Sequence, residues 1–207
     1  MMLTLSTLWY NIGMQKKAYH HGNLKEALIA AGLEILAEQG MDGLSLRNVA
    51  RRTGVSHTAP YNHFPDKQAL LAAISTAGYE QLHAILSETF ERTKNSPAKV
   101  LPEIAWSYFQ FALENPAKFK LMFSGALEEE RAHPNYIEIS RKSIALFEEI
   151  IAFCQGAGQL PQGRVEEIFV KLWSLVHGFT YLMLENQFPG EYQQGQDIKE
   201  TLKRIVM

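Results

Sequence analysis

Apolar residues recur every three to four positions along most of the chain, which is the spacing that places them on one face of an α-helix. Leu24, Leu28, Ala31 and Ile35 set this pattern, and it continues to the C-terminus without the period-two alternation of β-strands. Proline, glycine and asparagine divide it into segments. The pattern predicts an all-α protein with helices over about residues 23–40, 46–53, 57–64, 66–92, 98–113, 117–123, 134–155, 165–186 and 196–206.

The stretch from Gly54 to Leu71 predicts a tight turn between two short helices, followed by a longer helix. Gly54 can adopt the positive φ that ends a helix, and Ser45 stands where the N-cap of the preceding helix is expected. Asp66 is placed as the N-cap of the longer helix. Lys67 then lies at a helix N-terminus, where backbone N–H groups favour an anion such as a DNA phosphate. The arrangement is that of a helix-turn-helix.

Residues 61–71 read YNHFPDKQALL and resemble the YxHFxxKxxLL signature of the TetR family of one-component transcriptional regulators. The resemblance extends back through GLSLRNVARRTGVS, residues 43–56. Ala59 and Pro60 depart from it, because the broad family usually has a Thr-Leu pair there. Since proline lacks an N–H and clashes with the carbonyl four residues back, we expect a short recognition helix that starts at His57 or Thr58.

The resemblance implies a flexible basic arm over residues 1–22, a helix-turn-helix DNA-binding domain over 23–68, and an effector-binding and dimerisation domain over 69–207. It implies a homodimer that binds a palindromic double-stranded DNA operator, commonly as a repressor. We expect Tyr61, His63 and Lys67 to hold the DNA backbone, and His57, Thr58 and Asn62 to read bases. The full set of expected DNA contacts is Lys16, Lys17, Ser45, Arg47, His57, Thr58, Tyr61, Asn62, His63 and Lys67.

Charge is divided unevenly along the chain. The net charge is −2, but residues 1–67 hold seven Lys and Arg against five Asp and Glu, whereas the remainder holds thirteen against seventeen. The asymmetry favours DNA at the N-terminal end, and it is modest.

Residues 165–186 carry two apolar stripes on adjacent helix faces, more than one subunit's core is expected to cover. We therefore predict a two-fold dimer interface, shared with the last helix and formed by Ile168, Leu172, Leu175, Phe179 and Leu182. The run from Trp173 to Gly178, WSLVHG, also resembles the W…HG signature of one TetR subgroup. His177 within it is predicted to be a core or interface residue more often than a ligand contact.

Large aromatic residues crowd the two predicted helices over 98–123. At helical spacing they would form either a solid core or an apolar cavity with a few polar groups, and both interpretations stay open. For the cavity, the residues expected to contact a small, largely apolar or aromatic effector are Trp106, Phe109, Phe119, Met122, Phe123, Trp173, His177 and Tyr181.

Composition adds limits on function. The chain has 46% hydrophobic and 20% charged residues, ordinary for a globular protein, and its single cysteine, Cys154, argues against a disulfide or a zinc site. No catalytic or phosphate-loop motif is present, so we expect neither an enzyme nor a cofactor. A ligand-binding or enzymatic helical bundle with a vestigial helix-turn-helix, and a structural helical adaptor, remain the alternatives.

Residues 1–13 are apolar but lack a basic start and are shorter than the roughly 20 residues that span a bilayer, so we expect no signal or membrane segment and a cytoplasmic protein. Met14 is as good a candidate for the true start as Met1.

Overall fold

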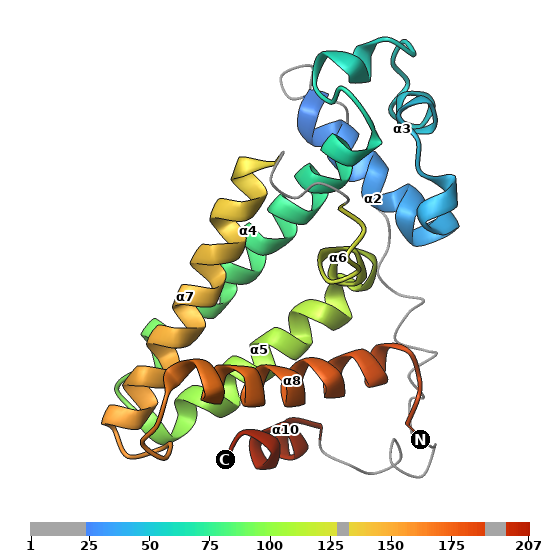
Figure 1. The fold of residues 1–207 in the computed structure, drawn as a ribbon. Helices are drawn as coiled ribbons and strands as arrows, with labels where there is room; N and C mark the ends of the chain where they lie inside the picture. The colour runs from blue at the N-terminus through green and yellow to red at the C-terminus, as the bar shows by residue number, and fades with distance from the viewer. Residues whose placement is uncertain (1–23, 128–132, 189–197) are drawn as a thin grey trace.

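The computed structural model describes residues 24–127, 133–188 and 198–207, and every regular element in these ranges is helical. The elements in chain order are α2 (Leu24–Gly43), α3 (Leu46–Thr53), the 3-10 helix η1 (Ala59–Asn62), α4 (Lys67–Thr93), α5 (Pro97–Glu114), α6 (Pro116–Met122), α7 (Pro134–Gly156), α8 (Val165–Leu184) and α10 (Ile198–Val206). The predicted all-α fold is confirmed. Figure 1 shows α2, α3 and η1 gathered at one end of the long helix α4, with the remaining helices along and beyond it.

Local capping chemistry sets the helix ends around the turn. The Ser45 side chain accepts a hydrogen bond from the Asn48 backbone N–H at 3.1 Å and so caps α3. Gly54 ends α3 with φ 75°, the left-handed conformation that glycine adopts without strain. At the start of α4, the Asp66 carboxylate accepts from the Ala69 N–H at 2.8 Å. These three caps lie where the sequence predicted them.

The recognition segment differs from the predicted helix over 57–64. Regular structure is limited to η1, whose turns close through bonds such as Tyr61 N–H to the Thr58 carbonyl at 3.1 Å and His63 N–H to the Pro60 carbonyl at 2.9 Å. Pro60 lies in the first turn of η1, where its missing N–H is tolerated. If an α-helix started earlier and included Ser56, the ring of Pro60 would clash with the Ser56 carbonyl four residues before it. The prediction was right that the element is short, and wrong about its start and its helix type.

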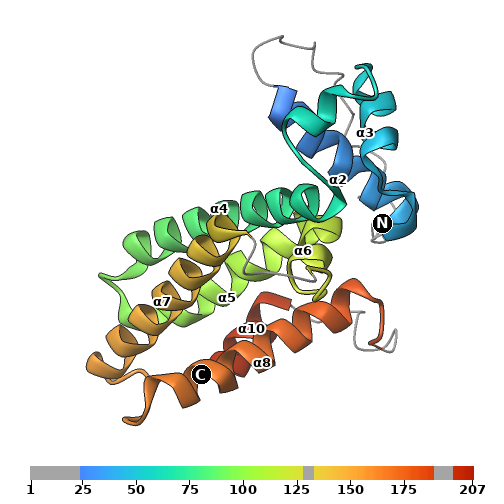
Figure 2. The same ribbon diagram turned by 45° about the horizontal axis from the view of Figure 1, so that its top comes forward.

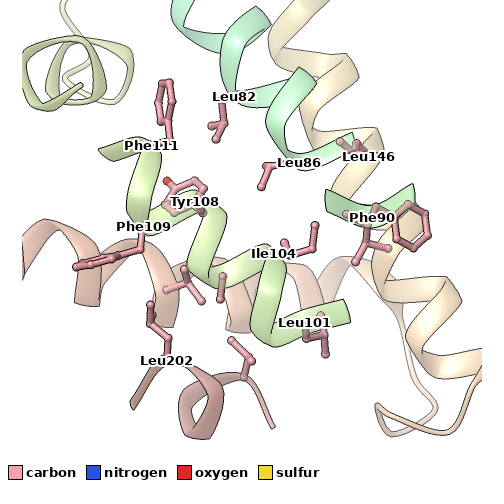
Figure 3. Packing of buried hydrophobic residues seen from close by; sticks show 14 of the residues in the cluster. Leu82, Leu86, Phe90, Leu101, Ile104, Tyr108, Phe109, Phe111, Leu146 and Leu202 are labelled. Atoms are coloured by element: carbon pink, nitrogen blue, oxygen red, sulfur yellow. The ribbon is translucent and has the colours of Figure 1, made fainter. Parts of the chain in front are cut away.

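Two hydrophobic cores share α4. The N-terminal core is formed by Leu28, Ala31, Ile35, Leu36, Leu44, Leu46, Val49, Phe64, Leu70, Leu71, Ile74 and Leu121. The C-terminal core is formed by Leu82, Leu86, Phe90, Val100, Leu101, Ile104, Ala105, Tyr108, Phe109, Phe111, Ala112, Phe119, Met122, Leu146, Ile150, Cys154, Val176, Leu202 and Val206. Figure 3 shows α4 and α5 facing each other across it. Burial in this core raises the pKa of the Cys154 thiol to about 11, which keeps the thiol protonated and unreactive.

Helix α6 lies between the two cores. Its Leu121 packs in the N-terminal core, while Phe119 and Met122 pack in the C-terminal core. Figures 1 and 2 both place α7 beside α4, and α8 with α10 at the end of the molecule away from α3. Within the described ranges, no helix combines the length and apolar character needed to cross a membrane.

Candidate nucleic-acid interface and ligand cavity

The segment around η1 presents polar side chains to solvent from an apolar base. Pro60 is buried and Phe64 is only 2% exposed, and these two residues hold the segment against the N-terminal core. The side chains between and before them point outward, and Tyr61 is 57% exposed. We call the exposed set His57, Thr58, Tyr61, Asn62 and His63 the recognition surface. Its donors and acceptors are suited to phosphates and base edges.

Helix α3 contacts η1, and α3 with its cap carries two more of the predicted DNA contacts. Arg47 is exposed, and Ser45 is half-buried with its oxygen occupied as a cap acceptor and its hydroxyl hydrogen available to a phosphate. Arg52 has a different role, because its guanidinium donates to Glu38 at 2.9 Å and to Glu34 at 3.2 Å on α2. That pairing holds the pKa of the Glu38 carboxyl below its usual range. Arg52 therefore joins α3 to α2.

Lys67 makes a contact that the sequence did not predict. Its ammonium donates to the Met41 backbone carbonyl at 2.7 Å and so ties the start of α4 to the end of α2. An ammonium has three N–H donors, so this bond leaves two for a phosphate. Lys16 and Lys17, which were predicted to contact DNA, lie outside the described residues.

The C-terminal core contains a cavity of about 150 Å³ between α4, α5, α7 and α8. Its wall is formed by Tyr79, Leu82, Tyr108, Phe123, Ser140, Ser143, Ile144, Phe147, Phe169 and Trp173. A smaller apolar cavity of about 40 Å³ shares Tyr108, Phe147, Phe169 and Trp173 with it and reaches toward Val206 on α10. We call the larger one the main cavity. The aromatic residues therefore form both a solid core and a cavity beside it, so each of the two open interpretations describes part of this region.

Tyr108 stands at the centre of this region, and the sequence analysis did not single it out. Its hydroxyl lies 2.7 Å from His177 Nδ1, and burial raises the pKa of Tyr108 while burial lowers that of His177. Both side chains are therefore neutral near pH 7, and the Trp173 indole N–H also interacts with the tyrosine oxygen. An indole can only donate, so we assign the tyrosine hydrogen to His177 Nδ1.

The predicted effector residues separate into groups. Phe123 and Trp173 line the main cavity. Phe109, Phe119 and Met122 lie in the adjoining core. His177 is not part of the cavity wall and lies behind it, in contact with the wall residues Tyr108, Phe123 and Trp173. Tyr181 is 43% exposed, and Trp106 stacks on Phe109 at 5.8 Å between ring centroids on the side that faces α10.

Other cavity residues were missed. Ser140, Ser143, Ile144 and Phe147 follow helical spacing on α7, and serines within an apolar stripe were the signal available for finding them.

Helix α8 leaves one face uncovered. Of its predicted interface residues, Leu172 and Phe179 pack against the C-terminal core, and Ile168 is half-buried. Leu175 and Leu182 are 44% and 43% exposed. Gly178 lies between them on the same face, and apart from the local backbone of α8 no atom lies within 4 Å of the place that a Cβ would take. We call Leu175, Gly178 and Leu182 the α8 outer face.

Comparisons with known proteins agree with these features. Residues 28–74 match the family described as bacterial regulatory proteins, tetR family, and residues 101–206 match the tetracyclin repressor-like C-terminal domain. The HTH-type transcriptional regulator YobS of Bacillus subtilis (strain 168) is 25% identical over 182 residues, which are 87% of each chain.

Solved structures resemble the fold over most of its length. A protein of unknown function from Rhodococcus sp. RHA1 has a TM-score of 0.75 and 31% identity, over 92% of this chain and 95% of that one. The TetR family transcriptional regulator PfmR from Thermus thermophilus has a TM-score of 0.66 and 18% identity, over 86% of this chain and 94% of its own. Because the two matched segments follow one another along this fold, the chain belongs to the TetR family of DNA-binding transcriptional regulators.

Proposed function

We propose that this protein is a homodimeric cytoplasmic repressor that binds a palindromic operator and is released from it by a small, largely apolar or aromatic effector. It acts without a catalytic step. The observation that carries the proposal is the recognition surface, an exposed polar and aromatic set fixed from beneath by Pro60 and Phe64. Polar and aromatic side chains held at fixed positions on the surface can pair with phosphates and base edges, which favours a functional element over a vestigial one.

Within this proposal, the residues of the recognition surface, together with Lys67, divide by reach and chemistry. Tyr61, His63 and Lys67 hold phosphates, since a phenol, an imidazole and an ammonium all donate at short range. Thr58 and Asn62, with His57, read base edges in the major groove. Ser45 and Arg47 add phosphate contacts from α3, and the basic arm with Lys16 and Lys17 adds charge.

The α8 outer face supports the homodimer. A leucine pair seven residues apart with a glycine between them lets a second helix approach closely, and covering it removes apolar area from water. Two-fold closure covers both copies with one surface. Leu172 and Phe179 pack behind this face in the C-terminal core, and half-buried Ile168, seven residues before Leu175, extends the face toward the start of α8.

The coupling between ligand and DNA passes through α6 and α4. Phe123, next to α6, lines the main cavity, whereas Leu121 of α6 packs in the N-terminal core. Gly78 of α4 lies so close to α6 that an added Cβ would come 2.5 Å from Met122 Sδ. A ligand that displaces Phe123 therefore moves α4. The two recognition surfaces of the dimer then no longer match successive major grooves, which are about 34 to 36 Å apart.

The test is selection of binding sites from random duplex DNA with the purified protein, followed by footprinting on the selected sequence. We expect an inverted repeat whose half-sites lie about one helical turn apart. Asn95→Ala, at an exposed asparagine beyond α4, is the matched control for Asn62→Ala and should select the same repeat as wild type. Recovery of unrelated sequences, with only salt-sensitive binding, would rule out the proposed operator recognition.

A further inference from the structure

The size of the main cavity limits its ligand to one ring. Its volume is about 150 Å³, and Leu82 at 1% exposure lies in its wall, while Ile144 at 45% exposure lies near its opening. A dry cavity of about 150 Å³ built into another protein takes up benzene. The adjoining cavity of about 40 Å³ leaves room for a small substituent.

The wall is suited to an aromatic ligand. Rings of Phe123, Phe147, Phe169 and Trp173 border the main cavity. The rings of Phe169 and Trp173 are stacked, with their centroids 5.9 Å apart and their planes 7° from parallel. Ring faces and edges of this kind pack favourably against another ring in offset or edge-to-face geometry. Among the described residues of this wall there is no Lys, Arg, His, Asp or Glu.

The hydrogen bonds of the wall limit the polar group of the ligand. Ser143 Oγ donates to the Ile139 carbonyl at 2.9 Å, and Ser140 Oγ donates to the Ile137 carbonyl at 3.0 Å. Each serine hydrogen is thereby used, but each oxygen keeps a lone pair that can accept. The Tyr108 hydroxyl is likewise bound to His177. The serines therefore offer acceptors to a ligand.

An anionic ligand would lack a partner in this wall, since a buried carboxylate needs a cation or several N–H donors. From the size, the rings and the two serine oxygens, we infer that the main cavity binds an uncharged single-ring aromatic compound that carries one hydroxyl group, a simple phenol. That this phenol is also the effector rests on the proposed function.

The test measures binding without DNA. Phenol, toluene and benzoate are titrated into the purified full-length protein by calorimetry, since they share one ring and differ in donor and charge. Phenol should bind more tightly than toluene, and benzoate should bind about 100-fold more weakly than phenol. Ser143→Ala should weaken phenol about tenfold and leave toluene unchanged, because only phenol loses an acceptor. Ser107→Ala removes a buried serine hydroxyl of the same core outside the cavity wall and should change neither affinity.

Three results would overturn the inference: benzoate binding as tightly as phenol, equal phenol affinity in wild type and Ser143→Ala, or no heat with phenol at millimolar concentration at either of two temperatures, since the binding enthalpy can be zero at only one of them. The last result in a protein that still selects an operator rejects the phenol class and leaves the regulator intact. Serine-dependent phenol binding in a protein that selects no operator supports the phenol class and rejects the proposed regulator. Release of the operator complex by phenol, and not by benzoate, supports both.

Discussion

The recognition surface and the α8 outer face are both exposed, but their contact with water differs. Tyr61 is 57% exposed amid polar side chains. Water solvates these side chains well, so the recognition surface needs no second chain to cover it. Leu175 and Leu182 are 44% and 43% exposed, and fully burying a leucine contributes about 1.5 to 3 kcal/mol. The recognition surface is therefore stable in water without DNA, whereas the α8 outer face is stabilised when a second copy of the chain covers it.

The two surfaces are also anchored differently. The recognition surface depends on two buried residues, Pro60 and Phe64, and a helix of four residues. The α8 outer face belongs to a helix of 20 residues whose opposite side packs into the C-terminal core through Val176. A weakly anchored surface with few contacts has low affinity alone, so we expect the dimer to supply most of the affinity for DNA.

The largest expected effect is therefore from the apolar surface. Leu175→Glu places a charge on the α8 outer face and should yield helical monomers whose operator affinity falls about 100-fold to 10,000-fold, because the second half-site contact is no longer intramolecular. Sedimentation, circular dichroism and operator titration measure the three properties. Leu113→Glu makes the same change at a leucine of α5 that is 38% exposed and should keep the dimer. Wild-type protein that sediments as a monomer at micromolar concentration would remove this distinction between the surfaces.

On the polar surface, the next effect is in sequence preference. Asn62→Ala removes an amide that can bond two atoms of a base edge, so discrimination at one position of each half-site should fall by about 1 to 3 kcal/mol. Operator selection with the variant measures this loss. If the Asn62→Ala variant selects the same sequences as wild type, Asn62 does not read bases, and base reading would be assigned to Arg47 or to the basic arm.

A smaller effect is expected at Lys67. Lys67→Ala should weaken binding to all sequences and reduce the salt dependence by about one unit of the logarithmic slope, as for the loss of one phosphate contact. Lys99→Ala, in the first turn of α5, is a matched control that should leave the slope unchanged. Since Lys67 also bonds the Met41 carbonyl, urea unfolding of the variant is needed alongside. A loss of stability with an unchanged salt slope would assign Lys67 to the fold alone.

The sequence predicted what depends on neighbours along the chain. The caps at Ser45, Gly54 and Asp66 follow from residues a few positions away, and each lies where it was expected. The bond from Lys67 to Met41 joins residues 26 positions apart, and that from Tyr108 to His177 joins residues 69 apart. Packing of whole helices sets such contacts, and the same packing turns Ser143 toward the main cavity. The helix pattern shows that a serine lies on an apolar face and does not show what that face surrounds.

The smallest expected effect concerns the interior behind the two surfaces, at His177. Rings of Phe119, Phe123, Trp173 and Tyr181 surround it, and burial lowers its pKa below the unfolded value of about 6.5. On acidification the unfolded chain therefore takes up this proton first, and stability falls as the pH drops through that value, by less than about 1.4 kcal/mol per pH unit.

His177→Asn keeps an acceptor for the Tyr108 hydroxyl and removes the titration, so its unfolding free energy should fall less than that of wild type between about pH 7 and pH 5.5. Urea unfolding at the two pH values measures the difference. Equal losses in wild type and His177→Asn would show that His177 is as well solvated as a surface residue. The interior behind α8 would then be open to water. In that case α8 would not separate a dry core from an apolar outer face, and its difference from the recognition surface would be confined to the exposed leucines.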